Sequence, residues 1–251
     1  MKLTGNTIFI TGGGSGIGRG LAEALHKLGN QVIISGRRKE VLAETVAANP
    51  GMASVELNIQ DPKDIAAVAE KLLKDFPALN VLINNAGVMS LDGANGPVDD
   101  ALLVSTVTTN LLGPVRMTSA LIEHLKKQPA AYVINVTSGL AFVPLAMTAV
   151  YSATKAAMHS FSLSQRYLLK DTSVKVLEIA PPYVQTELMG PQMAVDPRAM
   201  PLKDFIEQTV AELGTDADEV LVKNVLFLRN EAGPNDAGFT AKFNDMMAGG
   251  H

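Results

Sequence analysis

The chain has 251 residues, 47% of them hydrophobic and 18% charged, with a formal net charge of −4 at pH 7. This length fits one large domain as well as two small ones, and the composition is typical of a globular protein with a sizeable core. The acidic net charge argues against nucleic acid as the main partner. The absence of cysteine excludes disulfides and thiolate chemistry, and no stretch approaches the roughly 18 consecutive apolar residues that could span a membrane.

Short apolar runs alternate with longer helical patterns in chain order. Strands are predicted at residues 6–13, 31–36, 53–59, 80–87, 130–138 and 174–182. Helices are predicted at residues 18–30, 39–49, 61–76, 101–127 and 151–170. The third helix has Asp61 at the N-cap position and Pro62 at the first helical position, where both residue types are preferred. The long fourth helix contains an irregularity at Gly113-Pro114.

The predicted strands are almost continuously apolar, as strands buried on both faces are. Their alternation with helices of ten or more residues predicts right-handed βαβ crossovers and a parallel sheet with helices on both sides. We therefore expect an α/β fold with a Rossmann-type doubly wound sheet, in a single domain over residues 1–251. Beyond Pro182 the pattern weakens. A substrate loop is predicted at about 182–212 and a helix at 218–230, while the tail after them stays ambiguous.

The first strand runs into the glycine-rich segment TGGGSGIG, residues 11–18, and a helix follows. In doubly wound folds this turn holds a dinucleotide pyrophosphate, because glycine lets the backbone approach the phosphates and the helix N-terminus offers N–H donors. The spacing here is G-x-x-x-G-x-G rather than the common G-x-G-x-x-G. The alternative is a glycine-rich turn without a ligand, but the flanking strand and helix favour nucleotide binding.

The second strand ends without an acidic residue, in the segment QVIISGRR. NAD-binding relatives of this architecture place a carboxylate there to hold the ribose 2′-hydroxyl, and a carboxylate would repel a 2′-phosphate. Arg37 and Arg38 stand there instead, and a planar guanidinium binds phosphate through paired, charge-assisted hydrogen bonds. The pair therefore favours NADP(H) over NAD(H). The alternative is a solvated basic start to the next helix.

Tyr151 and Lys155 stand four residues apart in the segment YSATK, so a helix would bring them onto one face. One interpretation is a lysine stem packed beside an aromatic ring, and the other is a proton donor tuned by a fixed cation. A cation about 4 Å away at an effective dielectric of ~20 contributes on the order of 4 kcal/mol. Under the second interpretation, a Tyr151 pKa near 7–8 is therefore attainable, down from its ordinary value near ~10, with desolvation of the phenolate opposing part of the shift.

Three further features are expected at the same sheet edge. Ser138 ends the fifth strand 13 residues before Tyr151, NNAG ends the fourth strand at residues 84–87, and Asn110 lies in the long helix. Carboxyl ends of parallel strands meet at one edge, where ligands of this architecture bind. Together with the glycine turn and YSATK, these features resemble the short-chain dehydrogenase/reductase family over roughly residues 5–190.

The resemblance implies a role for each matching residue. Tyr151 would be the general acid/base, and Ser138 would hydrogen-bond the reacting oxygen. Lys155 would hold the cofactor ribose and lower the tyrosine pKa, and Asn110 would hold a water that links Lys155 to solvent. The alternative for Asn110 is a helix-interior amide bonded to backbone. The residues expected to bind cofactor are Gly12, Ser15, Gly16, Ile17, Gly18, Arg37, Arg38, Asn58, Ile59, Asn85, Ala86, Gly87, Tyr151, Lys155, Pro181, Val184 and Thr186.

The sequence departs from the family pattern in three places. Asn58 replaces the usual aspartate, although its amide oxygen can still accept a hydrogen bond from adenine. Pro182 replaces the glycine of the family's P-G-x-V-x-T segment. The usual seventh strand with V-D-G-G is not found, so FTAKFND, residues 239–245, is expected to form an edge strand or to pack on a partner subunit. PPYVQTEL and the tail resemble a bacterial subgroup named after D-alanine esterification of teichoic acids, a name that says little about substrate.

The expected substrate pocket is mostly apolar, which favours a small uncharged ketone or secondary alcohol. Its predicted walls are Leu140, Val143, Tyr183, Leu188 and Met189, with Met193, Ser90 and Leu91 as further candidates. The leading hypothesis is NADPH-dependent carbonyl reduction, reversible as alcohol oxidation. The alternatives are an NAD-dependent alcohol dehydrogenase of the same family, a non-catalytic NADP(H) sensor or scaffold, and a Rossmann-like methyltransferase.

The remaining expectations concern metal, location and assembly. The four histidines, His26, His124, His159 and His251, are scattered, so they are interpreted as structural or exposed and no metal site is expected. The N-terminal apolar run is too short for a signal peptide, which favours a cytoplasmic protein. By resemblance, the chain is expected to form a homodimer or homotetramer.

Overall fold

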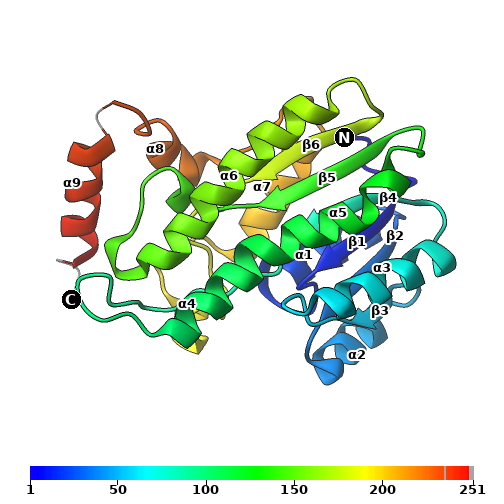
Figure 1. Cartoon of the computed structure of the whole chain (residues 1–251), viewed down its shortest axis with the longest axis horizontal. Coiled ribbons are helices and arrows are strands. Elements are labelled where there is room, and N and C mark those ends of the chain that lie inside the picture. The colour runs from blue at the N-terminus through cyan, green and yellow to red at the C-terminus, as the bar shows by residue number, and fades with distance from the viewer. Residues whose placement is uncertain (235, 249–251) are drawn as a thin grey trace.

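A computed structural model describes residues 1–234 and 236–248, so His251 and the end of the predicted domain lie outside the described residues. Within that part of the chain, seven parallel strands form one sheet in the order β3-β2-β1-β4-β5-β6-β7 (Figure 1). The strands are β1 (Thr7–Thr11), β2 (Gln31–Gly36), β3 (Ala53–Glu56), β4 (Leu79–Asn84), β5 (Ala131–Val136), β6 (Val174–Ile179) and β7 (Glu219–Val220). The α/β doubly wound fold expected from the sequence is therefore confirmed.

Helices cover both faces of the sheet and bury two apolar clusters against it. One face carries α1 (Gly16–Lys27), α2 (Lys39–Ala48) and α7 (Leu202–Leu213). The other carries α3 (Pro62–Asp75), α5 (Gly113–Leu125) and α6 (Ala149–Leu169). Strand order reverses between β1 and β4, which makes the carboxyl ends of these two strands the expected ligand crevice. As the sequence predicts, the Asp61 side chain caps α3 by accepting the Lys63 N–H at 2.8 Å.

The long fourth helix is continuous but contains a π-helical turn. α4 (Asp100–Val107) passes into a π-helical turn at Thr108–Leu112, and α5 follows directly. The predicted irregularity at Gly113-Pro114 is confirmed, since proline has no N–H to donate to the preceding turn. Asn110 lies in this π-helical turn and is buried.

The last third of the chain corrects three predictions. Residues 218–230 form β7, a short 3₁₀ turn and α8 (Leu226–Arg229) rather than one helix, because Glu219 and Val220 pair with β6. FTAKFND is not a strand but lies in α9 (Asp236–Ala248), whose Phe243 packs in an apolar cluster with Val143 and Leu228. The predicted substrate loop ends at Pro201, where α7 begins.

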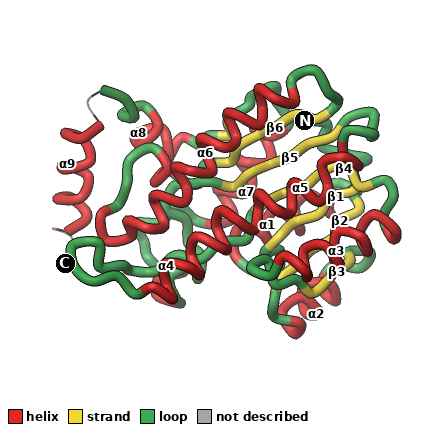
Figure 2. Tube along the Cα trace, viewed as in Figure 1, coloured by secondary structure: helices red, strands yellow, loops and turns green. Residues whose placement is uncertain are grey.

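Long loops connect the sheet to its outer helices. Figure 2 shows these loops between the strands and the helices α4, α8 and α9. The loop after β6 is closed on itself, because Val184 and Met200 form an isolated parallel bridge. Across the described residues, no helix is long and apolar enough to cross a membrane.

Candidate active site

The glycine turn folds tightly between β1 and α1. Gly12 and Gly16 have positive φ angles of +67° and +52°, which glycine adopts at little cost. A Cβ on Gly18 would lie 2.3 Å from the Gly12 carbonyl oxygen and 2.4 Å from Asn85 Nδ2. Glycine at position 18 is therefore required for the turn to pack against the end of β4.

Thr11 and Asn85 tie this turn to the neighbouring strand. The Thr11 hydroxyl accepts the Asn85 N–H at 3.0 Å and the Ala86 N–H at 3.1 Å. Asn85 Nδ2 donates in return to the backbone oxygens of Thr11 and Gly12 at 2.9 and 3.1 Å. The segment at residues 85–87 therefore borders the glycine turn, while its expected contact with the adenosine side of a cofactor stays a prediction. Thr11 is a supporting residue that the sequence did not single out.

A cavity of about 820 Å³ opens at this edge of the sheet. Its size lies within the roughly 300–1,000 Å³ of small-molecule sites. Ser15 stands at the N-cap of α1 without a side-chain cap bond, and the first turn of α1, fully described, contains no acidic side chain. The positive end of this helix and its N–H groups therefore suit an anionic ligand. The glycine-rich turn, the N-terminus of α1 and the cavity beside them therefore fit the pyrophosphate of a dinucleotide.

All residues predicted to bind cofactor line this cavity. They are Gly12, Ser15, Gly16, Ile17, Gly18, Arg37, Arg38, Asn58, Ile59, Asn85, Ala86, Gly87, Tyr151, Lys155, Pro181, Val184 and Thr186. Ser138 lines it too, so the glycine turn and the YSATK segment face one space. Lining residues that the sequence did not single out include Gln60, Thr109, Gln185, Glu187 and Leu202.

Two exposed arginines stand among the lining residues, directly after β2. Arg37 and Arg38 follow β2, and Arg38 donates to the Ser15 hydroxyl at 3.2 Å. The guanidinium is thereby held beside the N-terminus of α1. In the segment after the neighbouring strand β3, the Asn58 amide oxygen accepts the Gln60 N–H at 3.2 Å and keeps a second lone pair that can accept another bond.

Tyr151 and Lys155 lie on α6, and both side chains are buried. Lys155 Nζ donates to the Val136 backbone oxygen at 2.8 Å and lies 5.6 Å from the centre of the Tyr151 ring. The Ser138 hydroxyl oxygen accepts the Leu140 N–H at 3.1 Å, which leaves its own O–H available as a donor. A phenol, an aliphatic hydroxyl and a lysine ammonium group therefore lie together at the carboxyl end of β5.

The pKa of Tyr151 differs from the value expected from the sequence. Burial raises the pKa of Tyr151 to about 12, and a hydrogen bond with Ser138 acts in the opposite direction. Burial also lowers the pKa of Lys155 to about 8, against the attraction of Glu178. Desolvation of the phenolate therefore outweighs the hydrogen bond with Ser138, and the prediction of a lowered tyrosine pKa is wrong.

Asn110 uses its side chain to hold the chain after β4. Its Oδ1 accepts the Val88 N–H at 2.9 Å, and its Nδ2 donates to the Val88 oxygen at 2.8 Å and the Thr154 hydroxyl at 3.2 Å. The amide thus has the backbone partners that the alternative interpretation describes. A water linking Lys155 to solvent through Asn110 stays a prediction.

The predicted substrate residues divide into those that line the cavity and those that do not. Leu188 and Met193 line the cavity. Val143 is fully buried in an apolar cluster against α9, and Leu140 packs on the same cluster. Tyr183 donates to Asp196 at 3.0 Å. The described cavity lining includes none of Leu140, Val143, Tyr183, Met189, Ser90 and Leu91.

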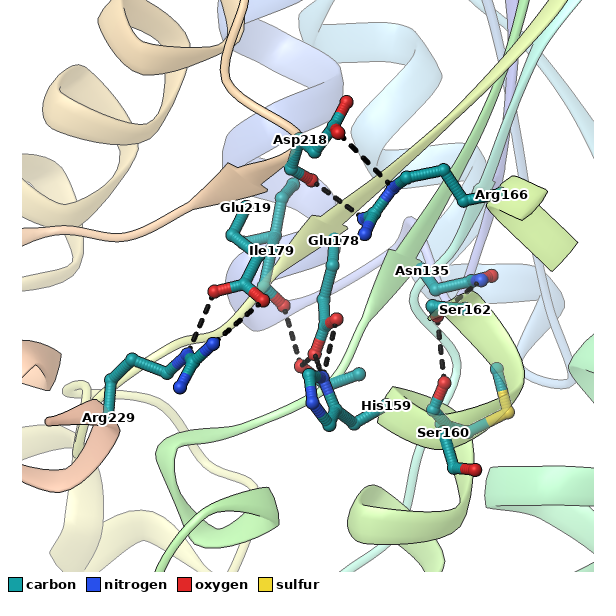
Figure 3. Close-up of polar contacts among 12 residues, drawn as sticks. Asn135, His159, Ser160, Ser162, Arg166, Glu178, Ile179, Asp218, Glu219 and Arg229 are labelled. Carbon is teal, nitrogen blue, oxygen red and sulfur yellow. Dashed lines mark hydrogen bonds and ion pairs between the residues drawn. The ribbon is translucent and has the colours of Figure 1, made fainter. Parts of the chain in front are cut away.

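A buried acidic residue beside this site was also missed by sequence reasoning. Glu178 on β6 is 0% exposed and contacts His159, a residue interpreted from the sequence only as structural or exposed (Figure 3). A glutamate inside the apolar strand VKVLEI was the available signal, because a buried carboxylate requires compensating partners.

Comparisons with known proteins agree with this geometry. A family model described as short chain dehydrogenase matches residues 6–195. The chain is 47% identical over 189 residues to the uncharacterized oxidoreductase DltE of Bacillus subtilis, covering 75% of each protein. It is 32% identical over 194 residues to an NADP-dependent 3-hydroxy acid dehydrogenase of Schizosaccharomyces pombe, covering 74% of each. A solved short chain dehydrogenase from Burkholderia cenocepacia in complex with NADP superposes with a TM-score of 0.84 at 27% identity, covering 96% of this chain and 98% of that one.

Proposed function

The chain belongs to the short-chain dehydrogenase family of oxidoreductases, and on that premise we propose that it reduces an uncharged ketone or aldehyde with NADPH, reversibly oxidising the secondary alcohol. The observation that carries the proposal is the shared cavity, because the glycine turn and the buried Tyr151, Lys155 and Ser138 all line it. The test is a screen of carbonyl compounds against NADPH and NADH in parallel, followed by absorbance of the reduced nicotinamide. Turnover supports a reductase, whereas cofactor binding without turnover of any carbonyl favours a sensor or scaffold.

Three residues of the chain act around the reacting oxygen, each in a different way. Bound NADPH supplies the hydride to the carbonyl carbon. Tyr151 holds a proton at its hydroxyl and delivers it to the carbonyl oxygen as negative charge develops there. Ser138 donates a hydrogen bond to the same oxygen, and the Lys155 charge stabilises the phenolate that remains. The raised pKa of Tyr151 suits the reductive direction, because the group that must give a proton is protonated at neutral pH.

The pH profile follows from these two side chains. Reduction is expected to stay level up to about pH 8 and then decline, because the pKa of Lys155 is about 8 and its charge is lost above that value. Alcohol oxidation is expected to rise with pH, since Tyr151 must first lose its proton. Initial rates in both directions between pH 5.5 and 9.5 check this. Reduction that accelerates steadily above pH 8 would contradict the assignment of roles.

The cofactor preference rests on Arg37 and Arg38, which we propose bind a 2′-phosphate. We expect Arg38→Ala to weaken NADPH binding by roughly 10- to 100-fold, because a hydrogen bond to a charged group contributes ~1.5–3 kcal/mol. NADH lacks that phosphate, so its Kd in the same variant serves as the matched control and should change by less than about twofold. Titration of nucleotide fluorescence measures both. Equal weakening of NADPH and NADH would count against a phosphate contact.

The substrate class is argued from the charges around the cavity. Among the described lining residues, the cations are Arg37, Arg38 and Lys155, and the two arginines follow β2, which lies three strands away from β5 in the sheet. Glu187 adds a negative charge near Leu188. A substrate carboxylate would therefore have no cation of its own at the nicotinamide side, which favours an uncharged substrate.

A second candidate substrate is a 3-oxo acid. The Schizosaccharomyces pombe relative, named as a 3-hydroxy acid dehydrogenase, favours it. Pairing each ketone in the screen with the corresponding 3-oxo acid separates the two candidates. Turnover of the acids alone would replace the uncharged substrate class with the anionic one.

A further inference from the structure

A row of polar residues crosses the sheet just below the candidate active site. The strand register places Asn84 beside Asn135, Asn135 beside Glu178, and Glu178 beside Glu219. All four side chains lie on the face covered by α5 and α6. Asn84 Nδ2 donates to Asn135 Oδ1 at 2.9 Å, and Asn135 Nδ2 donates to the Ser162 hydroxyl of α6 at 2.9 Å. Glu178 in this row is a carboxylic acid with 0% of its surface exposed. Burying a carboxylate is unfavourable unless neighbouring groups compensate its charge, so the question is which groups do so here.

Glu178 is held in place by two neighbours. The Thr137 hydroxyl donates to Oε1 of Glu178 at 2.7 Å. His159 Nδ1 lies 2.8 and 3.0 Å from the two carboxylate oxygens (Figure 3). The Glu178 side chain is 1% exposed and the His159 side chain 20%, so the histidine lies between the carboxylate and solvent. Both carboxylate oxygens thus have fixed partners in the free protein.

Helix α6 places His159, the partner of Glu178, on the same helix face as Lys155. Tyr151, Lys155 and His159 follow one another at four-residue spacing, so they share one face of the helix. Lys155 Nζ donates to the Val136 oxygen, and the next residue, Thr137, binds Glu178. The buried ammonium and the buried carboxylate therefore bind two consecutive residues at the end of β5, Val136 and Thr137.

We infer that Glu178 is a positioning residue of the active site, whose buried negative charge keeps Lys155 a cation beside Tyr151. The inference rests on the proposed function, in which that cation supports the tyrosine. Burial lowers the pKa of Lys155 to about 8, and the attraction of Glu178 opposes this shift. Without the carboxylate, Lys155 would lose its proton close to neutral pH.

The other charges around Glu178 are already paired or lie toward solvent. Arg229 of α8 binds Glu219 through two contacts of 2.8 and 3.2 Å. Arg166 of α6 lies 3.6 Å from Asp218. The pKa of His159 is raised chiefly by its hydrogen bond to Glu178, with Glu219 raising it further and Arg229 opposing. Once His159 is neutral at higher pH, Lys155 and Arg229 are the described cations that still feel the charge of Glu178, and Arg229 is already bound to Glu219.

The same cluster could be read as a metal site, because ligand atoms of His159, Glu178 and Glu219 lie within 4.8 Å of one another. The contacts favour the electrostatic role instead. The Arg229 guanidinium already neutralises Glu219, and the oxygens of Glu178 already have hydrogen-bond partners. An ion would have to displace these contacts.

The test is the Glu178→Gln variant, followed by NMR titration of the Lys155 ε-methylene in lysine-labelled, cofactor-free protein. The signal is assigned by its loss in Lys155→Met. We expect the pKa of Lys155 to fall by about one unit in Glu178→Gln, the size of effect that a neighbouring opposite charge exerts. Glu178→Asp keeps the charge and should restore most of the wild-type value. Asp218→Asn, which removes an exposed carboxylate nearby, is the matched control and should leave the titration unchanged.

A titration of Lys155 that is unchanged in folded Glu178→Gln would overturn the inference. If that variant does not fold, the double variant His159→Gln/Glu178→Gln replaces the pair with two amides, and the same lowered pKa is expected. The NMR titration does not depend on turnover. It therefore tests the effect of Glu178 on Lys155 separately from the proposed carbonyl reduction. A lowered Lys155 pKa in a protein that reduces no carbonyl supports the role of Glu178 and counts against the proposed function alone.

Discussion

Tyr151→Phe is expected to lower kcat for ketone reduction by roughly 10²- to 10⁴-fold, the range that a positioned general acid supplies. The phenyl ring keeps the shape of the side chain but has no proton to give. NADPH affinity should change little, because the glycine turn and Arg38 lie on other elements of the cavity. Steady-state kinetics and a nucleotide titration on the same preparation measure both quantities.

The matched control for this variant lies on the same helix. Tyr167 is 67% exposed near the end of α6, and Tyr167→Phe removes an identical hydroxyl far from the cavity. It should retain full activity. Wild-type kcat in Tyr151→Phe, with cofactor still bound, would show that the tyrosine hydroxyl is not the proton donor and would favour a different acid or a non-catalytic role.

Gly18→Ala is expected to reduce NADPH affinity by more than about 100-fold. The new methyl group would lie 2.3 Å from the Gly12 backbone oxygen, and backbone cannot rotate away as a flexible side chain can. The turn must therefore open, which moves the N–H groups that would face the phosphates. Overpacking of this kind also costs ~1–3 kcal/mol of stability, so a lowered Tm should accompany the loss of binding.

Gly238→Ala is the control for the added methyl group itself. Gly238 lies in α9, and a Cβ there meets no described atom within 4 Å. Alanine is a better helix former than glycine, so this variant should bind NADPH normally and be at least as stable as the wild type. Undiminished NADPH binding by Gly18→Ala would mean that the nucleotide lies elsewhere in the cavity.

The first 180 residues show why periodic patterns predict this kind of fold well. Strands β1 to β6 are short apolar runs between strongly periodic helices, and their predicted positions are confirmed. The family, named from five motifs in order, is confirmed by the family model and by the relatives. The resemblance to a bacterial subgroup is likewise confirmed by the 47% identical Bacillus subtilis protein.

Predictions failed where local pattern carries little information. Residues 218–230 are apolar enough for either a helix or a buried strand, and pairing of Glu219 and Val220 with β6 decides the outcome. The pKa of Tyr151 depends on how deeply the side chain is buried, which a four-residue spacing cannot reveal. The contact between Glu178 and His159 joins separate elements, so it depends on tertiary packing.

Substrate walls were the least predictable part of the site. Val143 and Leu140 follow Ser138 closely in sequence, yet the chain turns there and packs them under α9. The loop after β6 bends back at Val184 and Met200, which brings Met193 and Leu188 to the cavity while Tyr183 contacts Asp196. Such loop geometry depends on contacts between distant residues rather than on local propensity.

The central claim is that Tyr151 gives a proton while NADPH gives a hydride to a carbonyl carbon in this cavity. The most direct measurement incubates the protein with NADPH deuterated at the transferable nicotinamide position and an uncharged ketone, and analyses the product by mass spectrometry. The account predicts an alcohol with one deuterium on the carbinol carbon from the wild type, and almost none from Tyr151→Phe. Equal deuterium transfer by both proteins, or bound NADPH that transfers none to any carbonyl tested, would contradict it.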